Sequence, residues 1–103
     1  MTPLQILQRA RKRISKGWCK GHYALTSEGV DVQSDSKRAT RWCLIGATHT
    51  EDMQKTAYDL LLKSAHVEPG LLSRWNDAPR RTKKQVLAVI DKAIALCKRE
   101  ARK

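Results

Sequence analysis

The chain has 103 residues, enough for one small domain, and hydrophobic residues make up 41% of it, with no Phe. Lys and Arg total 21 against 10 Asp and Glu, which gives a net charge of +11, and there are three Cys. No apolar run approaches the ~18 residues of a membrane span, and an odd Cys count argues against a disulfide framework, so these numbers exclude a membrane protein, a disulfide-stapled toxin and a large enzyme.

The first segment predicts a helix that begins after Thr2, because Thr2 and Gln5 can form a capping box around Pro3 at the first helical position. Gly17 can end this helix by taking a positive φ. Apolar and polar residues then alternate on both sides of a Thr26–Gly29 turn. This alternation predicts a short β-hairpin at roughly 22–33.

Three further helices are predicted at about 37–47, 51–65 and 83–101, with a short helical turn at Leu71–Trp75. The helix at 37–47 follows the capping residues 34–36, and the helix at 51–65 is capped by residues 50–52. The last follows a Thr82/Gln85 capping box and has clean helical spacing of apolar residues. We therefore expect an α+β fold: a single domain over 1–103 of about four helices with a short hairpin packed against them, and a frayed basic tail at about 98–103.

Positive charge gathers at the two ends of the chain. Residues 1–24 hold six basic and no acidic residues, 79–103 hold nine basic and two acidic, and 25–78 hold six basic and eight acidic. We expect the first and last helices to pair through apolar faces, which would join their basic sides into one field that attracts phosphate or an acidic protein surface. The predicted contact residues are Arg9, Arg11, Lys12, Arg13, Lys16, Arg80, Arg81, Lys83 and Lys84.

Two other interpretations of this charge stay open. It can be a solubilising shell on two helices, or it can bind an acidic protein partner, as an inhibitor or adaptor would. No recognition-helix or RNA-binding signature is present, so we expect no base-specific reading.

A Cys₂His₂ zinc set could be drawn from Cys19, His22, Cys43 and His49. Cys43 lies between Trp42 and Leu44, which is more typical of a buried thiol, and the spacing is not that of a zinc finger. We expect Cys19 and Cys43 to pack together as free thiols, with no metal and no cofactor. No catalytic signature was found, so we expect no enzyme.

The three Trp either build the core or line a pocket for a flat ligand. Because the chain lacks Phe, the core interpretation is favoured. The pocket interpretation would use two rings with polar arms beside them. Its residues would be Trp18, Arg41, Trp42, Trp75, Asn76 and Asp77.

Three motifs carry a resemblance over about residues 4–97: Gly17-Trp18-Cys19-x-Gly21, Arg41-Trp42-Cys43-Leu44-x-Gly46-Ala47 and Trp75-Asn76-Asp77-Ala78-Pro79-x-Arg81-Thr82. With this order and spacing, the chain resembles the family labelled domain of unknown function 6197, seen in bacteria and their phages. The resemblance implies a small cytoplasmic α+β unit, in the host cytoplasm if a phage encodes it, and it implies no assigned activity. His22, His49 and His66 lie outside the family pattern, which weakens the zinc interpretation further. The basic ends are also particular to this member, which suggests adaptation of the basic surface to one partner, as in phage proteins that bind host machinery.

Overall fold

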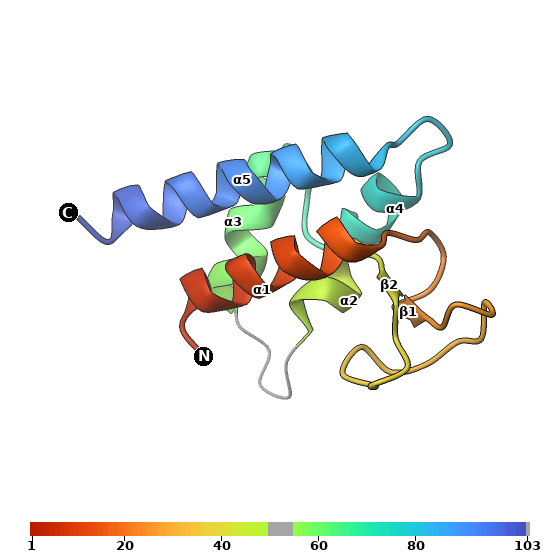
Figure 1. Cartoon of the computed structure of the whole chain (residues 1–103). Helices are drawn as coiled ribbons and strands as arrows, with labels where there is room; N and C mark the ends of the chain where they lie inside the picture. Colours follow the sequence, from red (N-terminus) through yellow and green to blue (C-terminus); the bar gives the residue numbers. More distant parts are fainter. Residues whose placement is uncertain (50–54, 103) are drawn as a thin grey trace.

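The computed structural model describes residues 1–49 and 55–102. Within them, five helices and one two-stranded antiparallel sheet confirm the α+β class (Figure 1). The elements are α1 (Pro3–Lys16), β1 (Ala24–Leu25), β2 (Arg41–Trp42), α2 (Leu44–Thr48), α3 (Lys55–Ala65), α4 (Leu72–Asp77) and α5 (Lys83–Glu100). No helix among the described residues is long and apolar enough to cross a membrane.

The first and last helices lie side by side and run in opposite directions (Figure 1). Both begin with the predicted capping boxes, in which Thr2 and Gln5, and Thr82 and Gln85, exchange hydrogen bonds between side chain and backbone. The predicted apolar faces meet, with Leu7, Ala10, Ile14, Val86 and Ile90 fully buried and Ile94 packed at the edge. The pairing of the terminal helices is therefore confirmed.

One hydrophobic cluster joins all five helices, because α3 packs against both α1 and α5 and α2 packs against α1. Its largest fully buried apolar side chains come from α1, α2, α3, α4 and α5: Ile6, Leu7, Ile14, Leu44, Leu61, Leu72, Val86 and Ile90. Burial of each such side chain stabilises the fold by roughly 1.5–3 kcal/mol. The core thus rests on aliphatic residues, with Trp42 as the one Trp among its buried members.

The hairpin predicted at roughly 22–33 forms only in part, with two backbone hydrogen bonds across the turn, from the Thr26 N–H to the Val30 carbonyl at 2.9 Å and from the Val32 N–H to the Ala24 carbonyl at 3.2 Å. β1 pairs with β2, in the register Ala24 with Trp42 and Leu25 with Arg41. The Thr26–Gly29 turn does form, with Gly29 at φ +84°, but the returning chain makes only an isolated bridge between Leu25 and Asp31. The hairpin is therefore closed by a segment about ten residues further along the chain than the pattern indicated.

The helix predicted at 37–47 is also shorter than expected, since only Leu44–Thr48 is helical. The backbone of Trp42 is extended because it bonds to the segment after α1: its N–H donates to the Gly17 carbonyl, and its carbonyl accepts from the Cys19 N–H, both at 3.1 Å. Long-range backbone pairing therefore overrides the helical spacing of the local apolar residues.

Gly17 does end α1, but not through a positive φ, because its φ of −174° is ordinary extended backbone. Its role is close approach: a Cβ at this position would collide with the Thr40 carbonyl oxygen. Gly46 is required in the same way, since a Cβ there would collide with the Tyr23 carbonyl oxygen.

At the remaining boundaries, α4 extends to Asp77, two residues beyond the predicted turn of helix. The cap predicted at residues 50–52 lies outside the described residues. α5 stays helical through Glu100, so residues 98–100 are not frayed as expected for the tail.

Candidate functional site

Two of the predicted contact arginines form hydrogen bonds to the protein's own backbone, at the C-terminal end of α2. Arg9 Nη2 donates to the His49 carbonyl at 2.6 Å, and Arg13 Nη1 lies 3.4 Å from the carbonyls of Gly46 and Ala47. Carbonyls at a helix end lack helical partners and carry partial negative charge, so cations stabilise them. Burial, and then the charge of Arg9, lower the pKa of Arg13.

Three more predicted cations join neighbouring elements. Arg11 bonds Asp91 of α5 at 2.6 Å, and that hydrogen bond, with the charge of Asp91, raises the pKa of Arg11. Lys83 Nζ donates to the Ser15 carbonyl at 2.8 Å, which ties the start of α5 to the end of α1. Arg81 Nε donates to the Trp75 carbonyl at 2.7 Å, with its guanidinium 3.9 Å from the centre of the Trp75 ring.

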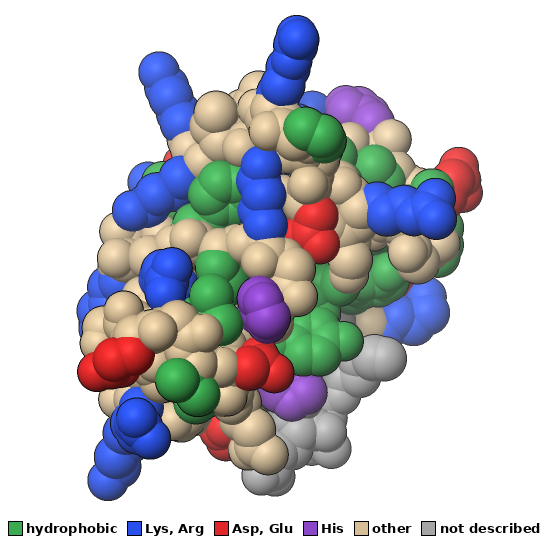
Figure 2. Space-filling view, turned by 90° about the vertical axis from the view of Figure 1, so that its right-hand side faces the viewer, with side chains coloured by type: hydrophobic (Ala, Val, Ile, Leu, Met, Phe, Trp, Pro, Cys, Tyr) green, Lys and Arg blue, Asp and Glu red, His purple; other side chains and the backbone are tan. Residues whose placement is uncertain are grey.

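Four predicted cations have exposed side chains and no ion-pair or hydrogen-bond partner within residues 1–49 and 55–102: Lys12, Lys16, Arg80 and Lys84. We call these four residues the basic end cluster. The bond from Lys83 to Ser15 brings the end of α1, where Lys16 lies, beside the start of α5, where Lys84 lies. Figure 2 views this end of the molecule, and Lys and Arg side chains project from its upper part and along its left edge.

The first turn of α5 contains no acidic residue. Acidic residues there would stabilise the helix, and basic residues there work against the positive end of the helix dipole. Lys83 offsets this by its bond to α1, whereas Lys84 and Arg80 have no such compensation in the described part of the chain. Lys84 and Arg80 therefore work against the dipole of α5, whereas Lys16, in the last turn of α1, favours the dipole of that helix.

The Trp-centred motifs interlock through Asn76, which is 1% exposed. Its Oδ1 accepts from Trp18 Nε1 at 2.9 Å and from the Leu44 N–H at 3.0 Å. Its Nδ2 donates to the Cys19 carbonyl at 3.2 Å and to Asp77 Oδ1 at 2.9 Å. One side chain thus joins α4, the start of α2 and the segment after α1.

The other polar groups of the predicted ligand pocket also bond within the protein. Asp77 Oδ1 accepts from the Gly21 N–H at 3.0 Å, and Arg41 Nη2 donates to the Thr26 carbonyl at 3.0 Å. Trp42 is 6% exposed, and its Nε1 donates to the buried Ser34 carbonyl at 2.8 Å. The pocket interpretation stays a prediction, but its polar side chains are already hydrogen-bonded to other parts of the protein.

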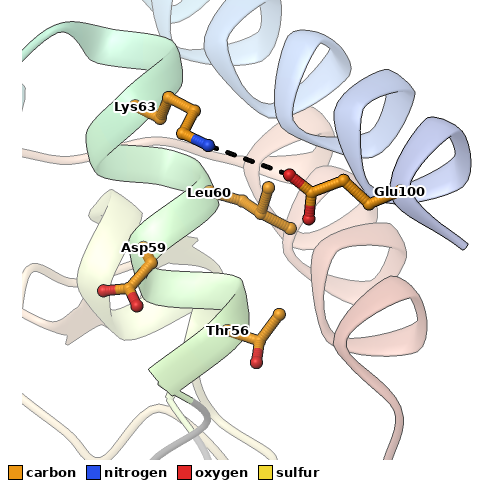
Figure 3. A pocket seen from close by; sticks show the side chains of 5 residues that line it. All are labelled: Thr56, Asp59, Leu60, Lys63 and Glu100. Carbon is orange, nitrogen blue, oxygen red and sulfur yellow. Dashed lines mark ion pairs between the residues drawn. The ribbon is translucent and has the colours of Figure 1, made fainter. Parts of the chain in front are cut away.

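A different hollow, of about 230 Å³, lies between α3 and the end of α5 (Figure 3). Its lining residues are Thr56, Asp59, Leu60, Lys63 and Glu100, and Lys63 forms an ion pair with Glu100 at 3.8 Å. It includes none of the residues that the sequence analysis singled out, and it is open to solvent.

The thiols of Cys19 and Cys43 lie in neighbouring extended segments, since Trp18 and Trp42 form a parallel bridge. Both Cys are free and buried, and burial raises the pKa of Cys19 to about 11 and also raises that of Cys43. Cys43 caps α2, where its Sγ accepts from the Gly46 N–H. No group of three His, Cys, Asp or Glu that could hold a metal ion occurs among the described residues, and His22 instead faces Asp31 at 3.5 Å.

The interlocked motifs are the ones on which the family resemblance rests, and the family model of DUF6197, described as a family of unknown function, matches residues 1–96. The chain belongs to this family. Neither the curated proteins nor the solved structures contain a significant match to it. In this DUF6197 chain, the motif residues Trp18, Trp42 and Asn76 hold the fold together, whereas the basic end cluster makes no such contact among the described residues.

Sequence reasoning missed two features of this end of the molecule. It named Asn76 as a polar arm of a ligand pocket, whereas Asn76 joins α4, the start of α2 and the segment after α1. It also left out Lys20, whose Nζ donates to the Ala78 carbonyl at 2.8 Å and lies 5.4 Å from the centre of the Trp18 ring. No signal in a single sequence marks either role, because both depend on which segments meet.

Proposed function

We propose that this chain is a non-enzymatic, cytoplasmic binding protein that contacts nucleic-acid phosphate through the basic end cluster. The observation that carries the proposal is the difference between two groups of cations. Arg9, Arg11, Arg13, Arg81 and Lys83 each bond to another part of the protein. Lys12, Lys16, Arg80 and Lys84 stay exposed at the junction of the terminal helices, where they are available to a ligand.

The physical environment of this junction favours a polyanion. The positive end of the α5 dipole adds to the positive field of the side chains, although the capping box of Thr82 and Gln85 engages two of its N–H groups. A chain with net charge +11 also attracts nucleic acid at long range, and each phosphate contact releases counterions. The three free thiols fit a reducing compartment, which supports a cytoplasmic site of action.

The test compares two variants with the same loss of charge. In the first, the four residues of the basic end cluster are replaced by Gln. In the control, Gln replaces four exposed cations elsewhere that have no side-chain partner among the described residues: Lys37, Lys98, Arg99 and Arg102. Removal of four charges takes both proteins from +11 to +7. Melting temperatures of both variants show whether the fold survives.

At low salt, we expect the cluster variant to bind a labelled oligonucleotide at least tenfold more weakly than the control, about 1.4 kcal/mol. If all four cations contact phosphate, the slope of log K against log salt should fall by about 3 to 4. Equal losses in the two variants would contradict the assignment to this cluster. Absence of wild-type binding even at low salt would contradict nucleic-acid binding, and an acidic protein partner would then be the better account of the same charges.

A further inference from the structure

Two aromatic rings beside the basic end cluster are each covered by a cation. The Arg81 guanidinium lies 3.9 Å from the centre of the Trp75 ring, a stacking distance, and its Nε bond to the Trp75 carbonyl fixes its orientation. The Lys20 ammonium lies 5.4 Å from the centre of the Trp18 ring. Its bonds to the carbonyls of Ala78 and Pro79 place it beside the two residues that precede Arg80 in the chain. The stacks and the cluster therefore belong to one surface.

These stacks remain partly open to solvent, unlike Trp42. Trp75 and Arg81 are both half-buried, whereas Trp42 is 6% exposed. The Trp75 indole covers one face of the guanidinium, so the opposite face is the one that a flat ligand can reach. A planar cation held on an indole, next to Arg80, which has no partner among the described residues, combines a stacking surface with a phosphate contact.

Building on the proposed function, we propose that the nucleic acid is single-stranded, and that a base stacks on the outer face of the Arg81 guanidinium while Arg80 and Lys84 contact the adjacent phosphates. In a duplex the faces of the bases are covered by their neighbours, so only an unpaired base can use this surface. Base stacking tolerates every base, which agrees with the absence of a base-reading motif in the sequence.

Three labelled ligands test the proposal on the wild-type protein: an oligothymidine, an abasic strand of the same length, and a duplex. The abasic strand keeps the phosphates and lacks the bases, so it isolates stacking from charge. We expect oligothymidine to bind at least tenfold more tightly than the abasic strand, and also more tightly than the duplex. Equal affinity for oligothymidine and the abasic strand would overturn the stacking proposal and leave phosphate binding intact, whereas no binding to any of the three would overturn both.

Two charge-conserving variants then test the assigned residue. Arg81→Lys keeps the charge and loses the planar group, and we expect it to reduce the preference for oligothymidine over the abasic strand to about threefold or less. Arg99→Lys, the same change on an exposed side chain in the last turn of α5 and outside the cluster, is the matched control and should keep the preference. Melting curves check that both fold. Should Arg81→Lys fail to fold, Arg81→Gln with the same ligand pair replaces it, and an unchanged preference in whichever variant folds would overturn the role of Arg81.

Discussion

Replacing Asn76 by Asp keeps the shape of a buried side chain that makes four hydrogen bonds and removes its two N–H donors. One carboxyl oxygen can still accept from Trp18 Nε1 and the Leu44 N–H. The other oxygen, in place of Nδ2, faces the Cys19 carbonyl at 3.2 Å and Asp77 Oδ1 at 2.9 Å. Two attractive contacts therefore become contacts between oxygen atoms, at a position that is 1% exposed.

The size of the effect follows from the protonation that this site imposes. A carboxylate cannot stay ionised so close to a carbonyl and to the Asp77 carboxylate, so the folded protein must hold the new group protonated. Protonation of an ordinary aspartate, with a pKa near 3.9, costs about 1.4 kcal/mol per pH unit, or about 4 kcal/mol at pH 7. The protonated carboxyl has one O–H in place of the two N–H groups of Asn76, so either the Cys19 carbonyl or Asp77 Oδ1 loses its donor, which adds roughly 1–3 kcal/mol. Against a total stability on the order of 5–15 kcal/mol, Asn76→Asp should unfold readily at neutral pH.

The sign of the pH dependence makes this prediction specific. The new carboxyl has a higher pKa in the folded than in the unfolded state, so the folded state binds the extra proton. The stability of Asn76→Asp relative to wild type should therefore rise as the pH falls from 7 toward 5, by up to about 1.4 kcal/mol per unit. Denaturant titrations at several pH values measure this, with Asn76→Ala as a control whose deficit should not depend on pH. A deficit below about 1 kcal/mol with no pH dependence would refute the role assigned to Asn76.

The remaining predictions concern the core and the thiols. Trp42→Ala should cost roughly 3–5 kcal/mol, measured by denaturant titration, and an unchanged melting temperature would contradict the burial of this ring. Gly46→Ala should cost about 1–3 kcal/mol or more, since its Cβ meets the Tyr23 carbonyl, and a fully stable variant would show that the Tyr23 backbone does not lie against α2 in this way. The pKa of Cys19 is raised from 9.0 to about 11, so the folded state keeps a thiol proton that the unfolded state loses; the unfolding free energy should fall as the pH rises across this window, and less steeply in Cys19→Ala. Identical slopes in the two proteins would contradict the raised pKa.

Features of the fold that depend on nearby residues were predictable from the sequence. The capping boxes at Thr2 and Thr82 involve residues three apart, and the apolar stripes of α1 and α5 repeat at helical spacing. Both signals lie within a few residues of one another, so the terminal helices and their pairing were expected correctly. The partner of β1 was not, because the bonds of Trp42 to Gly17 and Cys19 join segments far apart in the chain.

The candidate site divides in the same way. The sequence indicates an excess of cations at both ends, but it does not distinguish Arg13, which binds carbonyls of α2, from Lys16, which binds nothing among the described residues. That distinction depends on where α2 ends relative to α1. Because five of the nine predicted contact residues bond within the protein, only the four residues of the basic end cluster remain as candidates.

The pairing of the first helix with the last has a consequence for how the chain folds during synthesis. α1 is synthesised before α5, yet its apolar stripe of Ile6, Leu7 and Ile14 belongs to a cluster to which α2, α3 and α5 all contribute. A free helix of 14 residues is marginal in water, so α1 is not stably helical before its packing partners have been synthesised. The contact between α1 and α5 also forms slowly, since the long stretch of chain between them must close into a loop. The nascent chain therefore exposes part of the apolar stripe of α1 until α5 has been synthesised, and a chain that stops before Lys83 lacks the α5 side of this packing and becomes a substrate for proteases or chaperones.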